Sequence, residues 1–334
     1  MRILFKYSIS LVLLIIIFTG LFFIFKGRIT TFLSFNEKTQ ADYLIVEGWI
    51  SPNSLNQAAE EFKQNEYKKI ITTGVPLEPW FLMSTNAYLE FTFPGNKSRI
   101  QKGDTIAISL RGTDVKGIYA EYSLYINDSL VQKKYTSEAW KEYTYVIRKD
   151  RRLDNIMVSF NNDYFFGEED RNLYIGKLRV RDSMVAVRSK NSYYYTSINK
   201  SDSINMNYHS VAALAARELI SGGILENQIV ILPASEKARN RTFNSAMAVR
   251  NWFDSSRIKP VPVNVFTENI HARRTHLLYS KALGLEREET GVISVTGNSG
   301  DTRQNNKITN KNIISELTGY LYYRFLFNSD KYQK

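Results

Sequence analysis

The chain has 334 residues, of which 43% are hydrophobic and 13% aromatic, a composition typical of globular proteins and a length sufficient for two domains. Its 44 Lys and Arg residues outnumber its 33 Asp and Glu residues, which gives a net charge of +11. These cations are scattered, without a basic helix or the aromatic pattern of RNA-binding domains, so we expect no nucleic acid partner. The absence of cysteine excludes disulfides, thiol catalysis and cysteine-ligated zinc.

An uncharged apolar stretch lies near the start of the chain. Residues 7–25 run for 19 positions without a charged side chain, close to the ~20 residues that a membrane-spanning helix needs. No small-x-small cleavage site follows, and bulky Phe22, Phe23 and Phe25 occupy its end. We therefore predict that residues 1–35 form an uncleaved, single-pass signal anchor in the inner (cytoplasmic) membrane. The Lys and Arg residues on its two sides nearly balance, so charge does not fix its orientation.

Strand and helix patterns alternate at both ends of the remaining chain. Within residues 36–85, an apolar strand ends in a glycine turn, Ser51-Pro52 opens a helix, and a second strand follows, which is a βαβ pattern. The same alternation returns over residues 208–334. There we expect helices at 209–220, 242–254, 271–283 and 311–327 and strands at 228–232, 261–266 and 292–296. Together the two parts predict one α/β domain with a parallel sheet.

Between these parts, residues 86–182 alternate in short strands separated by turns such as Asn127-Asp128-Ser129. This pattern predicts an all-β sandwich inserted into the α/β domain. Residues 183–207 are rich in Ser, Asn and Tyr and are expected to form the linker that returns to the α/β domain.

The densest acidic cluster of this basic chain lies inside the expected sandwich. Its members are Asp163, Glu168, Glu169 and Asp170, on a glycine-containing loop between two strand patterns. Hard cations such as Ca²⁺ take about six to eight oxygen ligands, which such a loop can supply at short range. The alternative is a solvated loop that joins two strands, since no EF-hand pattern is present.

Residues around this loop resemble the calcium-dependent xylan-binding carbohydrate-binding modules. The resemblance runs from about residue 86 to residue 182, and its motifs are Ile106–Gly112, Tyr119–Asp128, Asn162-Asp163 after Phe160, and Asp170–Tyr174. In that family a loop-bound Ca²⁺ ligates sugar hydroxyls directly. The resemblance implies Asp163 and Asp170 as metal ligands, with Asn162 and the carbonyl of Glu169 as further ones. It also implies Tyr164, Arg171, Asn172 and Tyr174 as sugar-binding residues, the aromatic ones by stacking.

In the α/β domain, we expect ligands to bind beside the residues that follow each parallel strand. Glu47 directly follows a buried strand, where a carboxylate is costly unless it is partnered or used. His271 and Arg274 lie at a helix start after another strand, which suits a phosphate or carboxylate ligand. A histidine at a helix start is more often a cap or a surface residue, so this interpretation has a structural alternative.

A set of motifs in the α/β domain resembles the YdcF/SanA/ElyC-like family of bacterial envelope proteins. They are Asp42–Trp49, Ile70–Gly74, Gly222–Leu225 with Gln228–Leu232, Arg241–Ala246 and Val265–Ala282. The resemblance implies a Rossmann-like parallel sheet with helices on both faces, often tethered by one N-terminal helix. It places Gly48, Gly74, Thr242, Asn244, His271 and Arg274 in a cleft, although Thr242 could instead be a helix N-cap and Asn244 a polar first-turn residue. Glu47-Gly48-Trp49 replaces the Leu-Gly turn more usual in that family.

We therefore expect a membrane-anchored extracytoplasmic protein that binds a polysaccharide or oligosaccharide through Ca²⁺, with an α/β domain in cell-envelope polysaccharide or precursor metabolism. The alternative is an envelope enzyme that transfers or hydrolyses a phosphoryl- or glycosyl-lipid, the insert being only a spacer. Glu47 would then act as base, with His271 and Arg274 on the anion. The sequence carries no nucleophile elbow, Walker loop, Gly-x-Gly-x-x-Gly or His-Glu-x-x-His motif, so known hydrolase, kinase and dehydrogenase routes lack support.

Overall fold

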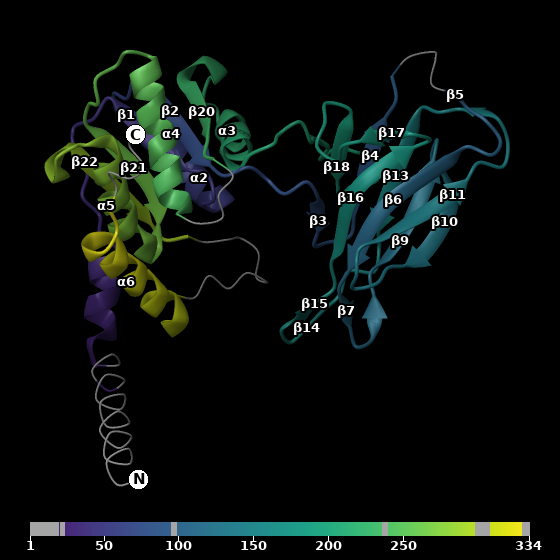
Figure 1. Cartoon of the computed structure of the whole chain (residues 1–334), viewed down its shortest axis with the longest axis horizontal. Coiled ribbons are helices and arrows are strands. Elements are labelled where there is room, and N and C mark those ends of the chain that lie inside the picture. Colours follow the sequence, from purple (N-terminus) through teal and green to yellow (C-terminus); the bar gives the residue numbers. More distant parts are fainter. Residues whose placement is uncertain (1–19, 21–23, 95–98, 236–239, 298–307, 329–334) are drawn as a thin grey trace, which may run out of the picture. The chain divides into compact units, whose positions relative to one another are not determined.

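A computed structural model describes residues 20, 24–94, 99–235, 240–297 and 308–328. The chain folds into two compact units (Figure 1). The α/β unit combines Met1–Pro76 with Ser210–Lys334, and the β unit comprises Leu77–His209. The β unit therefore interrupts the α/β unit in sequence.

The α/β unit is built on a five-stranded sheet in which every pairing is parallel. Its strands are β1 (Tyr43–Glu47), β2 (Lys69–Gly74), β20 (Ile229–Pro233), β21 (Val263–Glu268) and β22 (Thr290–Val295). They lie side by side in the order β20-β2-β1-β21-β22. Numbered along the chain, this order is 3-2-1-4-5, the order of doubly wound sheets, and it reverses between β1 and β21. The predicted parallel sheet is confirmed.

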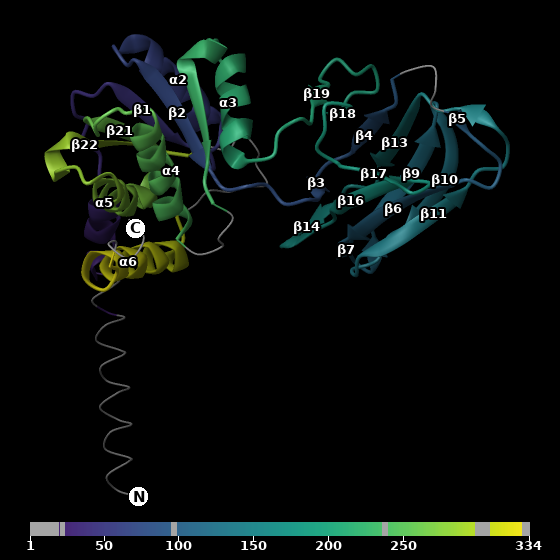
Figure 2. The ribbon, with the colours of Figure 1, turned by 45° about the horizontal axis from the view of Figure 1, so that its top comes forward.

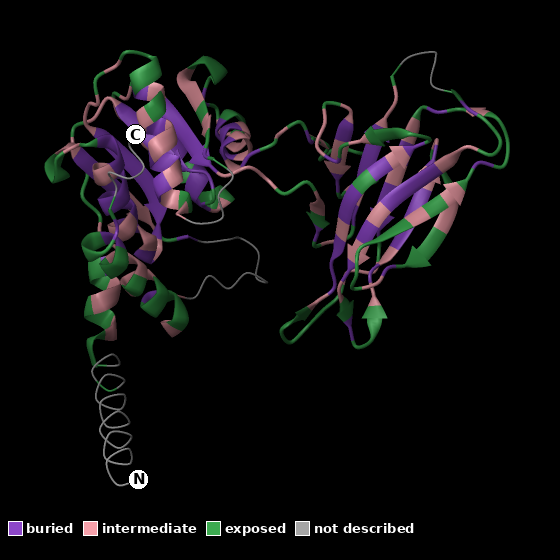
Figure 3. Cartoon of the chain, viewed as in Figure 1, coloured by how far each residue is buried: buried purple, intermediate pink, exposed green. Residues whose placement is uncertain are grey.

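Helices pack on both faces of this sheet (Figure 2). They are α2 (Pro52–Gln64), α3 (Val211–Ser221), α4 (Arg241–Ser255), α5 (Ala272–Leu283) and α6 (Asn310–Phe325), with short 3-10 turns at Glu226–Gln228, Asn269–His271 and Arg287–Glu289. In β1, Leu44 and Val46 join the apolar core that contains α2 and α3. Tyr43 and Ile45 point the other way and join the core that contains α4 and α5. This alternation explains why β1 is apolar at successive positions and fully buried (Figure 3).

The predicted membrane span lies almost wholly outside the described residues. Of residues 7–25, only 20, 24 and 25 are described. Residues 24–33 are helical, and Leu33 at the end of this helix packs with Ile270 and Ile313 of the α/β unit. Within the described part of the chain, no helix is long and apolar enough to cross a membrane.

The β unit consists of two main antiparallel sheets. One has the order β10-β9-β13-β4-β18-β19, and the other has the order β11-β6-β16-β17, with β3 also paired to β16. The strands of the first sheet are β4 (Ala87–Thr92), β9 (Glu121–Ile126), β10 (Ser129–Tyr135), β13 (Asn155–Phe160), β18 (Ser192–Tyr195) and β19 (Ile204–Asn205). Those of the second are β3 (Phe81–Met83), β6 (Thr105–Gly112), β11 (Lys141–Val146), β16 (Leu173–Val180) and β17 (Ser183–Val185).

Three small two-stranded pairs complete the β unit, namely β5 (Arg99–Ile100) with β12 (Arg151–Arg152), β7 (Asp114–Val115) with β8 (Ile118–Tyr119), and β14 (Phe165–Phe166) with β15 (Glu169–Asp170). The two main sheets share one apolar core. Leu89 and Phe91 of the first sheet are fully buried in the same cluster as Ile106, Ile108 and Leu110 of the second. Packing of two inner faces in this way defines a sandwich.

The expected linker over residues 183–207 is wrong. Residues 183–207 contain β17, which pairs with β16, and β18, which pairs with β4. Tyr195 is 1% exposed and stacks on Tyr88. The Ser- and Asn-rich composition led to the linker prediction, although the segment also contains a run of tyrosines, which have high strand propensity. The sandwich therefore extends beyond the predicted limits of 86 and 182.

Candidate functional sites

The acidic loop after β13 folds into a hairpin rather than an open coil. Phe165 and Phe166 of β14 pair with Asp170 and Glu169 of β15, and Gly167 at the tip has a φ of +64°. That left-handed conformation favours glycine. The hairpin leaves the side chain of Glu169 exposed, whereas Asp170 is partly buried at its base.

Arg171 holds the base of this hairpin. Its side chain is 7% exposed and donates hydrogen bonds to the carbonyl oxygens of Ile118 at 2.8 Å, Asn162 at 2.8 Å and Val115 at 3.0 Å. The guanidinium also lies 5.6 Å from the centroid of the Tyr164 ring. Arg171 therefore ties the β7–β8 turn to the loop, and its expected role as a sugar ligand stays a prediction.

The amide of Asn162 is likewise used inside the protein. Its Oδ1 accepts a hydrogen bond from the backbone N–H of Glu121 at 2.8 Å, and its Nδ2 donates to the carbonyl of Tyr119 at 3.0 Å. These two bonds join the loop to the start of β9. In this structure Asn162 therefore positions the loop, although it was expected as a metal ligand.

Asp170 and Asn172 offer the oxygens that best suit a cation. The hydroxyl of Thr113 donates to the Asp170 carbonyl at 2.6 Å and accepts from the Asn172 N–H at 2.8 Å, which fixes both residues. The Oδ1 atoms of Asp170 and Asn172 are buried and have no hydrogen-bond partner among the described residues. Buried acceptors without donors are costly, and a hard cation would satisfy both. Asp163 lies on the same loop, with its backbone N–H bonded to Asn86 Oδ1 at 3.0 Å.

Aromatic side chains surround this loop. Tyr164, Phe165 and Phe166 are 44%, 45% and 52% exposed, and so could stack on a sugar ring. Tyr174 is partly buried, with the Arg111 guanidinium 4.4 Å from its ring centroid. One face of Tyr174 is thus already covered by a side chain of the protein.

The α/β unit has a cleft of about 1010 Å³ beside the ends of β1 and β21, where the strand order reverses. This is the position at which doubly wound sheets bind ligands. Five of the residues predicted from the sequence line it, namely Glu47, Gly74, Thr242, His271 and Arg274. The structure thus brings together side chains that are far apart in the chain.

Glu47 ends β1 with 2% of its surface exposed. Its Oε2 accepts hydrogen bonds from the hydroxyls of Thr267 at 2.6 Å and Thr275 at 3.0 Å. The same oxygen lies 3.9 Å from the Nε2 atom of His271. Two hydroxyl donors offset the cost of burying this carboxylate, and the imidazole is close enough to exchange a proton with it through a small shift or a bridging water.

His271 lies between Glu47 and a second carboxylate, that of Glu316 on α6. Its Nδ1 is 3.1 Å from Glu316 Oε1 and 2.9 Å from Arg274 Nη2, and its Nε2 is 3.2 Å from the Thr242 hydroxyl. Arg274 Nη2 also donates to Glu316 Oε1 at 3.0 Å. Glu316 and Arg274, which both contact Nδ1, orient the imidazole ring and leave its Nε2 atom toward Thr242 and Glu47.

The sequence analysis assigned no role to Glu316, Glu268 or Trp49. Trp49 packs edge-on against His271 with ring centroids 4.9 Å apart. Glu268 ends β21 and accepts a hydrogen bond from the Ser51 N–H at 2.7 Å. Both follow predicted strands, a signal that could have identified them. Glu316 had no such signal, since it lies 45 residues beyond His271 in a helix.

Gly48 and Asn244, also predicted for the cleft, are not among its lining residues. A Cβ atom on Gly48 would lie 2.7 Å from the Val211 carbonyl oxygen, so this glycine allows α3 to approach β1. The Asn244 N–H donates to the carbonyl of Asn240, which occupies the N-cap position of α4 that was proposed for Thr242. Thr242 is instead free to face His271.

Glu316 should make stability depend on pH. Burial, the largest single effect, raises its pKa, but the hydrogen bond and charge of His271 and the charge of Arg274 outweigh it, so the pKa lies below the ordinary 4.5. A carboxyl group whose pKa is depressed by folding stabilises the protein above its unfolded pKa and loses that contribution as pH falls through the folded pKa. The melting temperature of Glu316→Gln should therefore lie below that of the unmodified chain at neutral pH, and the gap should close as the pH falls through the depressed pKa of Glu316. Exposed Glu226→Gln is the control, and a gap independent of pH would contradict the assignment.

Comparison with known proteins bears on the β unit. Residues 105–195 match a family model described as a Ca-dependent, xylan-binding carbohydrate-binding module, CBM60. The β unit contains a carbohydrate-binding module. The match covers β6 to β18 and includes the whole hairpin loop and Arg171. No curated protein matches the chain.

Three solved structures share distant similarity with the chain. The calcium-dependent carbohydrate-binding module vCBM60 is 16% identical over 32% of this chain and 92% of that module, with a TM-score of 0.23. A Paenibacillus sp. cycloisomaltooligosaccharide glucanotransferase is 11% identical over 41% of this chain and 24% of that one, with a TM-score of 0.16. The Glycosylation Associate Protein (Gap123) complex from Streptococcus agalactiae is 12% identical over 73% of this chain and 77% of that one, with a TM-score of 0.21. Similarity this distant does not indicate function.

Proposed function

We propose that the β unit binds a xylan-like polysaccharide or oligosaccharide through a Ca²⁺ ion held by the hairpin loop after β13. The observation that carries this proposal is the family match of residues 105–195, which includes the loop. The partnerless buried oxygens of Asp170 and Asn172 support it, because they are acceptors that a hard cation would satisfy. Exposed Tyr164 and Phe165 would stack on the sugar rings.

The ligands of such an ion would have to be mixed. In the described part of the chain, no group of three or more His, Asp or Glu side chains is placed to hold a metal. Asp170, Asn172 and Asp163 would therefore act with main-chain carbonyls, such as that of Glu169, and Ca²⁺ accepts all of these oxygen types. When bound, the ion would supply a charged centre that coordinates sugar hydroxyls. The protein would provide the fixed loop, through Arg171 and Thr113.

The test is calorimetric titration of the full chain with xylohexaose, in calcium and in EGTA. Binding should be present in calcium and lost in EGTA and in Asp170→Ala. Glu168→Ala, which removes an equal charge from the exposed part of the same loop, is the matched control and should keep binding. Glycan binding that persists in EGTA would overturn the role of the ion. A melting temperature raised by calcium without any glycan binding would make the ion only structural.

We also propose that the apolar segment 7–25 anchors the chain in the inner membrane with both units outside the cytoplasm. The support is the uncharged length of that segment and the presence of a glycan-binding module, whose polymer would be met outside the cytoplasm. Accessibility of the β unit to protease in intact spheroplasts tests this, and full protection would contradict it.

A second function is favoured by the cleft of the α/β unit. We propose that this unit acts on an envelope precursor, a phosphoryl- or glycosyl-lipid, as its resemblance to the YdcF/SanA/ElyC-like family implies. The supporting observation is that Glu47, His271 and Arg274 line one cleft at the reversal point of the sheet. Glu47 would serve as base, while His271 and Arg274, positioned by Glu316, would face the anionic group.

A further inference from the structure

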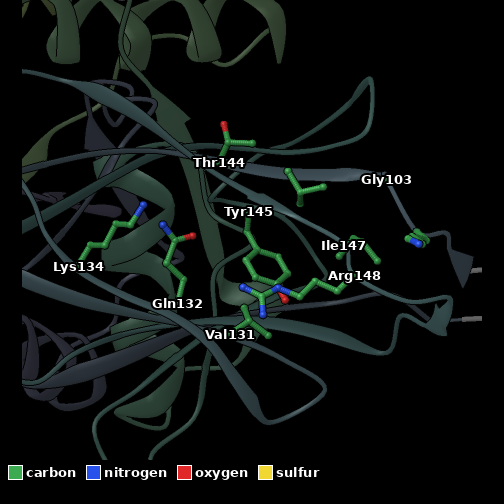
Figure 4. A pocket seen from close by; sticks show the side chains of 10 residues that line it. Gly103, Val131, Gln132, Lys134, Thr144, Tyr145, Ile147 and Arg148 are labelled. Carbon is green, nitrogen blue, oxygen red and sulfur yellow. The ribbon is translucent and has the colours of Figure 1, made fainter.

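The β unit has a hollow beside two edge strands of the sandwich, β10 and β11 (Figure 4). Its volume is about 600 Å³. It is lined by Lys102 and Gly103, by Val131, Gln132 and Lys134 of β10, and by Thr144–Arg148 in and just after β11. Both β10 and β11 are the outermost strands of their sheets, so each has one backbone edge without a strand partner. None of these residues belongs to the hairpin loop. We call this hollow the edge groove.

The edge groove is positively charged. Residues 131–152 carry seven Lys and Arg side chains against three Asp and Glu side chains. Other cations of the β unit are neutralised nearby, such as Lys133 by Glu121 at 2.7 Å. By contrast, Lys102, Lys134 and Arg148 in the groove form no ion pair with any described residue. Their charge is therefore available to a ligand.

A backbone contact brings two of the cations of the groove close together. The Gly103 N–H donates to the Ile147 carbonyl at 2.9 Å, which brings the turn with Lys102 beside Arg148. Two acids contact this region: the Asp150 carboxylate accepts from the Lys102 backbone N–H at 2.8 Å, and the Asp104 carboxylate lies 3.8 Å from Arg181. Asp150 is not among the lining residues, so it reduces the positive charge of the groove without occupying it.

The walls of the groove also suit a sugar. Tyr145 and Val131 are half-buried against the core and offer apolar surface, and Figure 4 places Tyr145 between Gln132 and Arg148. The Oε1 atom of Gln132 is buried without a hydrogen-bond partner among the described residues, so a sugar hydroxyl could satisfy it. A groove with an aromatic wall, an amide oxygen and three cations without ion pairs matches sugars that bear carboxylates.

We propose that the edge groove is a second glycan site, independent of the hairpin loop, which binds acidic sugar units through Lys102, Lys134 and Arg148. This proposal rests on the β unit being a carbohydrate-binding module. The module would then bind two kinds of group on one polymer. The loop would bind hydroxyls of the neutral backbone, and the groove would bind carboxylates of the substituents.

The test compares two ligands that differ only in charge, a glucuronate-substituted xylo-oligosaccharide and the same compound with its carboxyl group reduced to an alcohol. In EGTA, where the loop site is disabled, the full chain should bind the acidic form and not the reduced one. Lys134→Gln with Arg148→Gln should weaken this binding by about tenfold or more, since each cation contributes a charge-assisted hydrogen bond. Lys177→Gln with Lys190→Gln, two exposed lysines outside the groove, is the matched control.

The outcomes separate this proposal from the calcium-dependent one. In calcium, the reduced ligand should bind the groove variant and the unmodified chain equally, which reports on the loop alone. If the reduced ligand does not bind the unmodified chain or the variants in calcium, the proposed calcium-dependent function is wrong. The measurement in EGTA still tests the groove site by itself. Equal binding of the acidic and reduced ligands in EGTA would overturn the groove site. The groove site would also be overturned if a single-stranded oligonucleotide bound as tightly as the acidic ligand, because that would show nonspecific electrostatic binding of anions.

Discussion

Arg171→Met is expected to lower the free energy of unfolding of the β unit by about 3 kcal/mol or more. The substitution keeps much of the apolar stem but removes three hydrogen bonds from the guanidinium to the carbonyls of Val115, Ile118 and Asn162, and hydrogen bonds to charged groups contribute about 1.5–3 kcal/mol each. Scanning calorimetry of the full chain should show one transition shifted to lower temperature. Arg148→Met, which makes the same change at an exposed arginine, should leave that transition in place.

The same variant distinguishes a structural arginine from a sugar ligand. If Arg171 bound the glycan directly, Arg171→Met would abolish binding and leave the melting temperature unchanged. Because Arg171 makes three backbone contacts, we expect the opposite result. The protein should lose much of its stability, and its affinity for xylohexaose should fall only because the loop is less well ordered. Saturating calcium should then recover part of the affinity, because an ion that binds only the folded loop stabilises it by mass action.

The α/β frame could be predicted because each of its features is local. β1 is an apolar run of four residues followed by Glu47 and a glycine turn, and the Ser51 side chain caps α2 as the Ser-Pro pair indicated. The prediction for the β18 segment was wrong because the structure of this segment depends on distant residues. Its burial depends on pairing with β4, about a hundred residues earlier, and no local pattern distinguishes such a strand from a tyrosine-rich linker.

The part of the cleft that follows from sheet topology could be predicted from the sequence. Residues that follow parallel strands collect at one edge of a sheet, so Glu47 and the start of α5 could be placed together without coordinates. The partners of His271 could not be, because Glu316 reaches it only through the docking of α6. In the hairpin loop, the family resemblance implied Asp170 as a metal ligand and Asn162 as a further one. Only hydrogen bonding separates them, since the amide of Asn162 is occupied and the Oδ1 atom of Asp170 is not.

Glu47→Gln is expected to remove the activity of the α/β unit by a factor of about 10²–10⁴, the usual contribution of a positioned general base. The amide cannot take a proton, so the neighbouring His271, whose Nε2 lies 3.9 Å from Glu47 Oε2, would lose its carboxylate partner on the cleft side. The fold should survive, because an amide oxygen can still accept from the Thr267 and Thr275 hydroxyls.

Complementation of a strain that lacks the gene measures this loss without requiring a purified substrate. Glu47→Gln should fail to complement while its melting temperature and its calcium-dependent binding of xylohexaose stay unchanged. Glu60→Gln, an exposed carboxylate on α2, should complement fully. Full complementation by Glu47→Gln would remove the case for acid–base chemistry, and the cleft would then be a binding site whose anion is held by Arg274. Failure to complement together with unchanged folding would instead show that the cleft needs the carboxylate of Glu47, as a base or as the charged partner of His271.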